Sequence, residues 1–244
     1  MSDTLPGDDR LPRYRRVFDA LLDSVVAGCW QPGDRLPSEQ SLAEQYGVAP
    51  GTVRQAISNL VHDGVLERRQ GRGTFVRQPN FTSAMFRFFR FESAGGEALY
   101  PSARILSCVR VPPPPAVAEQ LGISGRASAI HLSRLRLIGE APVLAESIWL
   151  PYSLFKPLLK VAPDGWGPLL YPLYQELCGQ VIAHAEETLT FGWCDPETAD
   201  LLNVAPKTPA ISIERLAGGY DGTPLEWRRT LGRAEKFRYR TEIR

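Results

Sequence analysis

The chain carries the stretch PGTVRQAISNLVHDGVLERRQGRGTFV at residues 50–76, and this stretch decides the fold of its N-terminal part. Its proline suits the first turn of a helix, and apolar residues then recur at helical spacing until Gly64 ends the helix. Two strand-like runs, residues 65–69 and 74–77, flank Gln70-Gly71-Arg72-Gly73, which is typical of a hairpin turn. The stretch therefore predicts a helix followed by a β-hairpin.

Two further helices are predicted upstream of this stretch. Apolar residues recur at helical spacing over residues 13–27, and Gly28 ends that run. After a turn-rich segment at residues 31–37, Ser38 is a good N-cap for a short helix that Gly47 breaks. Three short helices and a hairpin describe a winged helix-turn-helix. Periodicity alone leaves open a small helical bundle that binds nothing.

An ordered set of motifs runs through this segment: Gln31-Pro32-Gly33-Asp34-Arg35-Leu36-Pro37-Ser38-Glu39, Thr52-Val53-Arg54-Gln55-Ala56, Asp63-Gly64-Val65-Leu66 and Gly71-Arg72-Gly73-Thr74-Phe75-Val76. On these motifs the segment resembles the GntR family of bacterial transcription regulators. The resemblance implies that the second helix of the turn enters the major groove of DNA and that the wing tip reaches the minor groove.

The resemblance and the chemistry of the side chains together predict the DNA contacts. Arg54 is the best candidate for base readout or an adjacent phosphate contact, because arginine can donate to both O6 and N7 of guanine. Thr52 and Ser38 offer hydroxyls and helix N-termini to phosphates. In the wing, Gly71 lets the backbone approach closely and Arg72 supplies charge. The predicted DNA-binding residues are Ser38, Gln40, Gly51, Thr52, Arg54, Gln70, Gly71 and Arg72.

The segment departs from the family pattern at two places. Gln40 stands where many members carry arginine, and Ala49-Pro50 replaces a common Ser-Arg before the groove helix. Both changes remove polar contacts, so we expect weaker or differently specified binding. Residues 12–80 hold nine arginines, no lysine and seven acidic residues, a net charge of +2. We therefore expect a homodimer that binds two half-sites of an inverted-repeat operator in double-stranded DNA.

Composition narrows the classes of protein further. The 244 residues have a net charge of +1, so nucleic-acid binding must come from a local patch. No apolar run reaches the ~18 residues of a membrane span, and residues 1–10 do not read as a secretory signal. Four cysteines without a CxxC motif and three histidines argue against a metal site. We expect a cytoplasmic protein with reduced thiols and no cofactor, metal or membrane partner.

Residues 79–100 are predicted to form a linker between a DNA-binding domain at 10–78 and a second domain at 101–244. The linker interleaves Arg87 and Arg90 with an aromatic cluster: Phe81, Phe86, Phe88, Phe89 and Phe91. Such a pattern can bind single-stranded nucleic acid. We favour a strand that packs on the next domain.

The second domain is rich in predicted strands. These are residues 105–111, 129–138, 143–150, 181–191, 210–217 and 224–231. Helices are expected at 153–160, 168–177 and 196–202, and a run of four prolines at 112–115 starts another short helix. This order predicts an α+β fold in which helices pack on an antiparallel sheet.

Two neighbouring strands place charged residues among apolar ones. Alternation puts Arg134 and Arg136 on the same side as Ile130. If residues 139–141 form a three-residue turn, Arg134 lies directly opposite Glu146, within reach of an ion pair. Two interpretations remain open, a salt bridge at a surface edge and a pocket whose spare positive charge binds an anionic ligand.

Further motifs follow in this region: Leu132-Ser133-Arg134-Leu135-Arg136, Ala145-Glu146-Ser147, the helix around Tyr171, Ala185-Glu186-Glu187-Thr188 and Pro224-Leu225-Glu226. On them the region resembles the UTRA effector domain of HutC-type GntR regulators, which is related in fold to chorismate lyase. The resemblance implies an effector site formed by Arg134, Arg136, Glu146, Tyr171 and Glu226. Leu169 replaces a common serine and the aromatic residue expected near Gly232 is missing, so we expect a small anion that need not be a sugar phosphate.

The sequence thus predicts a DNA-binding repressor that a small anionic metabolite releases from its operator, with no catalytic residues. One alternative is a chorismate-lyase-like enzyme with Glu146 as acid or base, but a complete DNA-binding head would then have no purpose. The other is an effector-independent DNA-binding protein, which would not need Arg134 and Glu146 on one face.

Overall fold

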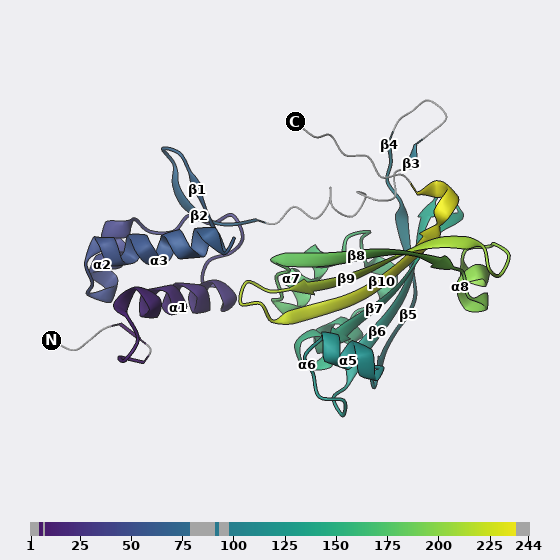
Figure 1. The fold of residues 1–244 in the computed structure, drawn as a ribbon, viewed down its shortest axis with the longest axis horizontal. Coiled ribbons are helices and arrows are strands. Elements are labelled where there is room, and N and C mark those ends of the chain that lie inside the picture. Colours follow the sequence, from purple (N-terminus) through teal and green to yellow (C-terminus); the bar gives the residue numbers. More distant parts are fainter. Residues whose placement is uncertain (1–4, 7, 79–90, 93–97, 238–244) are drawn as a thin grey trace. The chain divides into compact units, whose positions relative to one another are not determined.

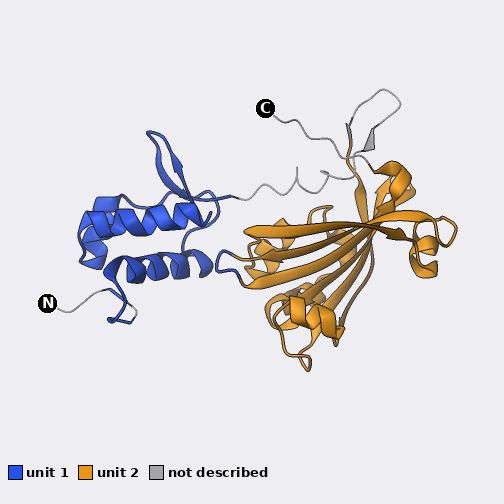
Figure 2. Cartoon of the chain, viewed as in Figure 1, with its two compact units in different colours: residues 1–79, 220–222 blue, residues 80–219, 223–244 orange. Residues whose placement is uncertain are grey.

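The computed structural model of the protein describes residues 5–6, 8–78, 91–92 and 98–237. The chain forms two compact units (Figure 2), residues 1–79 with 220–222 and residues 80–219 with 223–244. Most of the aromatic cluster expected in the linker lies outside the described residues. Within the described ranges, no helix is long and apolar enough to cross a membrane, and no three His, Cys, Asp or Glu residues gather as metal ligands would.

The first unit has the predicted winged helix-turn-helix fold (Figure 1). Its elements are α1 (Arg13–Val26), α2 (Glu39–Tyr46), α3 (Pro50–His62), β1 (Leu66–Arg69) and β2 (Gly73–Val76). The buried faces of the helices and the hairpin share one apolar core, which includes Val17, Leu21, Leu42, Val53, Ile57, Leu60 and Val76. Oγ of Ser38 accepts a hydrogen bond from the backbone N of Ser41 at 3.1 Å, so Ser38 caps α2 as predicted.

The second unit is a six-stranded antiparallel sheet with helices on both faces. The strands are β5 (Ser102–Val111), β6 (Ala129–Ile138), β7 (Ala141–Pro151), β8 (His184–Trp193), β9 (Pro209–Gly218) and β10 (Pro224–Arg233), in the order β5-β6-β7-β10-β9-β8. The helices are α5 (Pro115–Gln120), α6 (Tyr152–Phe155), α7 (Leu170–Cys178) and α8 (Pro196–Leu201). A short pair, β3 (Phe91–Glu92) and β4 (Ala98–Leu99), precedes the sheet.

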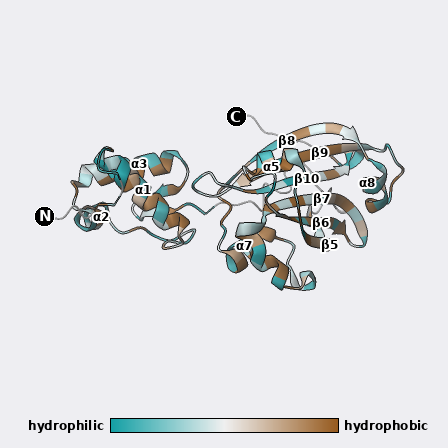
Figure 3. Ribbon diagram, turned by 90° about the horizontal axis from the view of Figure 1, so that it is seen from below, coloured by the Kyte–Doolittle hydropathy of each residue, from teal (hydrophilic) through white to brown (hydrophobic). Residues whose placement is uncertain are grey.

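Alternation along the strands divides the second unit into two apolar layers. Helices α6 and α7 pack on one face, where Phe155 and Tyr174 join a core with Ile130, Leu132, Ile148 and Leu150. Helices α5 and α8 pack on the opposite face, where Val117 belongs to an apolar cluster with Ala129 and Trp149, and Ala199 to another with Leu135 and Ala145. The same strands carry apolar and polar segments in turn (Figure 3), as period-two alternation requires.

The turn between β6 and β7 differs from the prediction. The loop has two residues, Gly139 and Glu140, and Ile138 pairs with Ala141. A register shift after Arg136 then leaves Val143 unpaired, so Arg134 still faces Glu146. The predicted three-residue turn is wrong, but the pairing that it was used to derive is confirmed because a bulge supplies the extra residue.

Two helices also begin or continue differently from the prediction. The helix expected at residues 153–160 is α6 followed by a 3-10 helix at Lys156–Lys160. The helix expected at residue 168 starts at Leu170, because Leu169 has an extended backbone.

Candidate DNA-binding surface and effector site

The first turn of α3 presents the residues predicted to enter the major groove. Gly51 and Arg54 are exposed, and Thr52 is half-buried. Nε of Arg54 donates to Oε2 of Glu39 at 2.8 Å, while 65% of the Arg54 side chain stays exposed. Glu39 on α2 therefore orients the guanidinium group that we expect to contact DNA.

A second arginine shares this carboxylate. Nη2 of Arg68, on β1, lies 3.5 Å from Oε1 of Glu39 and donates to Oγ of Ser58 at 3.1 Å. The contacts of Glu39 with the two arginines bring the starts of α2 and α3 and the first strand of the wing together. Arg68 was not among the predicted DNA-binding residues, although alternation along its predicted strand places it on the opposite side of the hairpin from Glu67 and Arg69.

The wing turn is exposed and depends on glycine. Gln70, Gly71 and Arg72 are all exposed. Gly71 has a φ of 69°, a conformation that residues with a side chain rarely adopt. At the base of the wing, the guanidinium group of Arg69 lies 4.4 Å from the centre of the Phe75 ring. The turn thus presents Arg72 on a hairpin whose base is packed.

The two remaining predicted contacts lie at the start of α2. Ser38 and Gln40 are exposed, and both side chains already take part in hydrogen bonds. Ser38 caps the helix, and Nε2 of Gln40 donates to Oε1 of Glu44 at 2.9 Å. A phosphate contact by either side chain would have to share or replace these bonds.

A buried cluster of ion pairs and hydrogen bonds, the arginine cluster, lies on one face of the sheet. Arg134 on β6 pairs in register with Glu146 on β7, and its Nε donates to Oε2 of Glu146 at 2.6 Å. The two side chains are 0% and 3% exposed. The open interpretation of a salt bridge at a surface edge is therefore wrong, since this pair is buried between interior strands.

The arginine cluster extends to residues of β10 and α7. Nη1 of Arg228 lies 3.4 Å from Oε1 of Glu146, and its Nη2 donates to Oε2 of Glu226 at 2.7 Å. Tyr174 donates to the same Oε2 at 2.8 Å, and Tyr171 donates to Oε1 of Glu226 at 3.1 Å. Glu226 is thus the point where the sheet and α7 are joined.

The arginine cluster also includes residues of β9 and β8. Nη1 of Arg215 donates to the hydroxyl of Tyr171 at 3.1 Å, and its Nε donates to Oε1 of Glu187 at 2.8 Å. Among the described residues the cluster holds one more arginine than glutamate: Arg134, Arg136, Arg215 and Arg228 against Glu146, Glu187 and Glu226. The site is therefore buried and carries a positive formal charge.

Arg136 connects this cluster to the start of α7. Its Nη1 donates to the carbonyl oxygen of Pro168 at 2.5 Å, and Nη1 of Arg134 donates to the same oxygen at 3.4 Å. The next residue, Leu169, is the N-cap position of α7 and makes no side-chain capping bond. The arginines therefore reach the backbone at the position where the resemblance led us to expect a serine side chain.

Burial and charge together set the protonation of the site. Burial raises the pKa of Glu146, but the guanidinium groups around it, that of Arg134 most, outweigh this effect and hold it at about 2. Burial lowers the pKa of Arg136 to about 10. Burial also raises the pKa of Tyr171 to about 12, and the adjacent carboxylate adds to the rise. At neutral pH these groups are a carboxylate, a guanidinium ion and a neutral phenol.

Nη2 of Arg134 and Nε of Arg228 are buried and have no hydrogen-bond partner among the described residues. Arg134 is 1% exposed and Arg228 is 3% exposed. An unsatisfied buried donor costs about 1–3 kcal/mol, and more when the group is charged, so such donors are uncommon. A ligand with anionic oxygens would satisfy both groups.

The structure brings together all five residues that the resemblance assigned to an effector site: Arg134, Arg136, Glu146, Tyr171 and Glu226. It adds Tyr174, Arg215 and Arg228, which were not among the predicted site residues. Arg228 follows Glu226 by two positions in a predicted strand, so alternation alone places both on one face. Arg215 carried no comparable local signal, because its partners come from β8 and α7.

Comparison with known proteins places both units. The model of the bacterial regulatory proteins of the gntR family matches residues 13–76, and the model of the UTRA domain matches residues 97–238. The HTH-type transcriptional repressor NagR of Bacillus subtilis is 29% identical, covering 94% of this chain and 93% of NagR. The Escherichia coli repressor of the mannosyl-D-glycerate transport/metabolism system, MngR, is 27% identical, covering 93% and 94%. The crystal structure of PhnF from Mycobacterium smegmatis aligns with a TM-score of 0.55 and 26% identity over 92% of this chain and 98% of PhnF.

Proposed function

Because this chain belongs to the GntR family of bacterial regulators that carry a UTRA domain, and is an effector-responsive DNA-binding regulator and not an enzyme, we propose that it is a repressor released from its operator by a small anion. The observation that carries the proposal is the pair of buried, unsatisfied guanidinium donors on Arg134 and Arg228. They belong to a cluster in which arginines outnumber glutamates.

The roles of the individual residues follow from their chemistry. Arg134 and Arg136 bind the phosphate or carboxylate of the effector, since guanidinium groups form strong charge-assisted hydrogen bonds with such oxygens. Glu146 and Glu226 accept hydrogen bonds from hydroxyl or amine groups of the same molecule. Tyr171 completes the site from α7. MngR is named for mannosyl-D-glycerate, a sugar joined to a carboxylate, and sugar acids are therefore a first class of compounds to test.

The head binds DNA through the start of α3 and the wing. In the major groove, Arg54 contacts a base or an adjacent phosphate. Ser38 and Thr52 donate to phosphates, and Gln40 and Gly51 lie beside them. The wing residues Gln70, Gly71 and Arg72 reach the minor groove, where Arg72 contacts the phosphate backbone. One such head with a modest positive charge needs a second copy for firm binding, so the protein acts as a homodimer on an inverted repeat. As a bacterial DNA-binding regulator it works in the cytoplasm.

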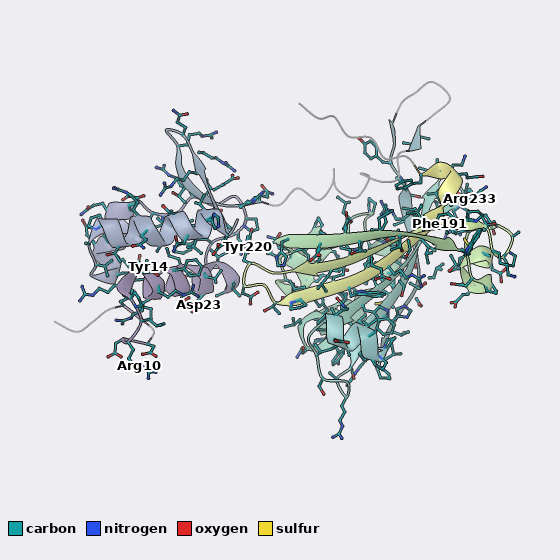
Figure 4. All side chains as sticks on the ribbon, viewed as in Figure 1. Arg10, Tyr14, Asp23, Phe191, Tyr220 and Arg233 are labelled. Carbon is teal, nitrogen blue, oxygen red and sulfur yellow. The ribbon has the colours of Figure 1, made fainter. Side chains whose placement is uncertain are left out.

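The effector domain supplies the dimer interface. Strand β8 is an edge strand of the sheet, and its Phe191 and Trp193 are each 61% exposed. Their rings meet at a centroid distance of 5.4 Å, so they form one apolar patch. Phe191 and Arg233 lie toward the same end of the sheet (Figure 4), consistent with their pairing to adjacent residues of β9. Exposed aromatic residues on an edge strand favour contact with another chain.

The experiment that tests the function measures release of DNA. Carboxylate and phosphate metabolites, sugar acids first, are screened for a rise in melting temperature of the full-length protein, and hits are titrated into its operator complex by fluorescence anisotropy. We expect an anionic hit to release the DNA. Tyr171→Phe should raise the concentration needed for half-release by about ten-fold, or 1.4 kcal/mol, at unchanged DNA affinity. Tyr100→Phe, at a residue that is 71% exposed, is the control.

Two results would contradict the proposal. One is release by a neutral compound as effective as its anionic counterpart. The other is a normal response of Tyr171→Phe to the effector, which would mean that the site is wrongly placed.

A further inference from the structure

A second concave site lies on the opposite face of the same sheet. Alternate residues of β6, β7 and β10 point away from the arginine cluster and form the floor of a cleft of about 430 Å³. Pro114 and Val117 from the start of α5, and Glu197 and Thr198 of α8, line its walls. A volume of this size with a few polar groups among apolar ones is typical of a small-molecule site.

The floor of the cleft is ordered in two rows by the strand register. One row is aromatic, because His131 pairs with Trp149 and Trp149 pairs with Trp227. The next row is polar, because Ser147 pairs with Ser133 on one side and with Arg229 on the other. A ligand on this floor would contact indole rings and hydrogen-bonding groups together.

The aromatic row is held in place by Ser147. Nε1 of Trp149 donates to Oγ of Ser147 at 3.2 Å, and that hydroxyl lies 2.9 Å from Nε2 of His131. Since the hydroxyl accepts from the indole, its own proton is available to Nε2. The rings of His131 and Trp149 are stacked, with centroids 4.3 Å apart and planes 18° from parallel. Burial lowers the pKa of His131, so this ring adds no charge to the cleft at neutral pH.

The acidic groups of the cleft outnumber its basic groups. Asp195 accepts from the backbone N of Thr198 at 2.8 Å, and Arg229 lies near enough to contribute to lowering its pKa. Arg229 also pairs in register with Glu214 of β9 and donates to Oγ of Ser212. The cleft is thus lined by the carboxylates of Asp195 and Glu197 and by one guanidinium group, that of Arg229, which leaves it with a net negative charge.

We propose that this cleft binds a small organic cation that carries an amine or ammonium group, with Glu197 as its counter-ion and Trp227 as its aromatic wall. Trp227 lines the cleft and is only half-buried, so part of its side chain is accessible to a ligand. A carboxylate and an indole ring that line one cleft suit the recognition of an ammonium group, because the ring quadrupole attracts a cation. The two faces of the sheet would then prefer ligands of opposite charge. The proposed anion site does not depend on this proposal, because it lies on the other face.

The test compares two probes that differ only in charge. Choline and its neutral carbon isostere, 3,3-dimethylbutan-1-ol, are titrated into the full-length protein by isothermal titration calorimetry. We expect choline to bind with a dissociation constant below about 1 mM and the isostere at least about ten-fold more weakly. Equal binding of the two probes, or no binding of choline in this range, overturns the proposal.

Variants locate the binding to the cleft. Glu197→Gln removes one exposed charge and should weaken choline binding by about ten-fold, whereas Asp200→Asn makes the same charge change elsewhere on α8 and should leave it within about two-fold. Trp227→Leu keeps an apolar side chain but removes the ring, and should weaken choline more than the isostere. Choline affinity that is unchanged in Glu197→Gln, or reduced equally in Asp200→Asn, would show that the cation does not bind here.

Discussion

Arg54 and Arg72 are both exposed, but their surroundings give them different tasks. Arg54 is oriented by Glu39, whereas Arg72 stands at the tip of a glycine turn. An oriented guanidinium loses little entropy when it forms two hydrogen bonds to guanine. An exposed charge at a wing tip is suited to the phosphate backbone of DNA, which carries no sequence information.

The first prediction separates these tasks. Arg54→Ala should weaken binding to the operator by about 1–3 kcal/mol and relax its specificity, as for a lost bidentate base contact. Arg72→Ala should weaken binding to all sequences and flatten the salt dependence. Gel-shift titrations at several salt concentrations measure both effects. Arg15→Ala, at a half-exposed arginine of α1 paired with Asp19, controls for the lost charge. Unchanged affinity in both test variants would contradict the proposed DNA surface.

A second residue-level prediction concerns pH and Glu146. Its pKa is about 2 in the folded protein and 4.5 without its surroundings, so the unfolded state binds more protons as pH falls. The stability that this carboxylate contributes is therefore complete well above pH 4.5 and is lost as pH falls toward 2. The full shift corresponds to about 3 kcal/mol, of which about 1.4 kcal/mol should be lost between pH 7 and pH 3.5.

The measurement is urea unfolding of the wild type and Glu146→Gln, followed by tryptophan fluorescence. Glu146→Gln should cost about 3–5 kcal/mol at pH 7, since it leaves buried arginines without their counter-ion, and the gap should narrow at pH 3.5. Glu140→Gln, at a side chain that is 97% exposed, should show no such pH-dependent gap. A constant gap for Glu146→Gln would mean that its pKa is not depressed.

At the residue scale, the sequence predicted those contacts of the site that join neighbouring strands connected by a short turn. Arg134 and Glu146 lie on adjacent strands joined by a short turn, so counting along the two strands placed them together, although a two-residue turn and a bulge replace the predicted three-residue turn. Arg228 and Arg215 were missed because their partners come from strands and helices that are distant in sequence. The orientation of Arg54 by Glu39 was missed for the same reason, since it depends on how α2 and α3 pack.

At the scale of elements, periodicity predicted helices and strands well where one face is buried. It failed at details that depend on local backbone geometry. The bulge at Val143 adds one residue to β7, and no sequence pattern predicted it. Helix α7 starts two residues later than predicted because the backbone of Leu169 is extended. Arg134 and Arg136 donate to the carbonyl oxygen of the residue before it, Pro168.

The third prediction concerns the start of α2. Ser38→Ala removes the capping hydrogen bond to Ser41 and should destabilise the helix by about 0.5–2 kcal/mol. Hydrogen exchange of the α2 amides in the full-length protein measures the change. Ser38→Asn keeps a capping oxygen and should exchange like the wild type. If both variants exchange alike, the side chain of Ser38 does not cap the helix in solution.

The sheet order belongs to the scale of the whole molecule. Strands β5, β6 and β7 pair in sequence order, but β10 inserts between β7 and β9, and β8 becomes an edge. Only this order brings Arg228 beside Glu146 and exposes the aromatic residues of β8. Sequence predicted an antiparallel sheet but not its order, because long-range strand pairing has no local pattern.

The last prediction tests the proposed dimer through that edge. Full-length protein should be a dimer by light scattering at micromolar concentration. Phe191→Glu introduces a charge into the exposed patch of β8, and its burial in an interface would be costly, so the variant should shift toward monomer. Because a monomer contacts only one half-site, its operator affinity should fall with it. Leu106→Glu, on the opposite edge strand and 42% exposed, is the matched control and should remain dimeric. A wild type that is monomeric would exclude a dimer in free solution, and a dimeric Phe191→Glu would place the interface elsewhere on the effector domain.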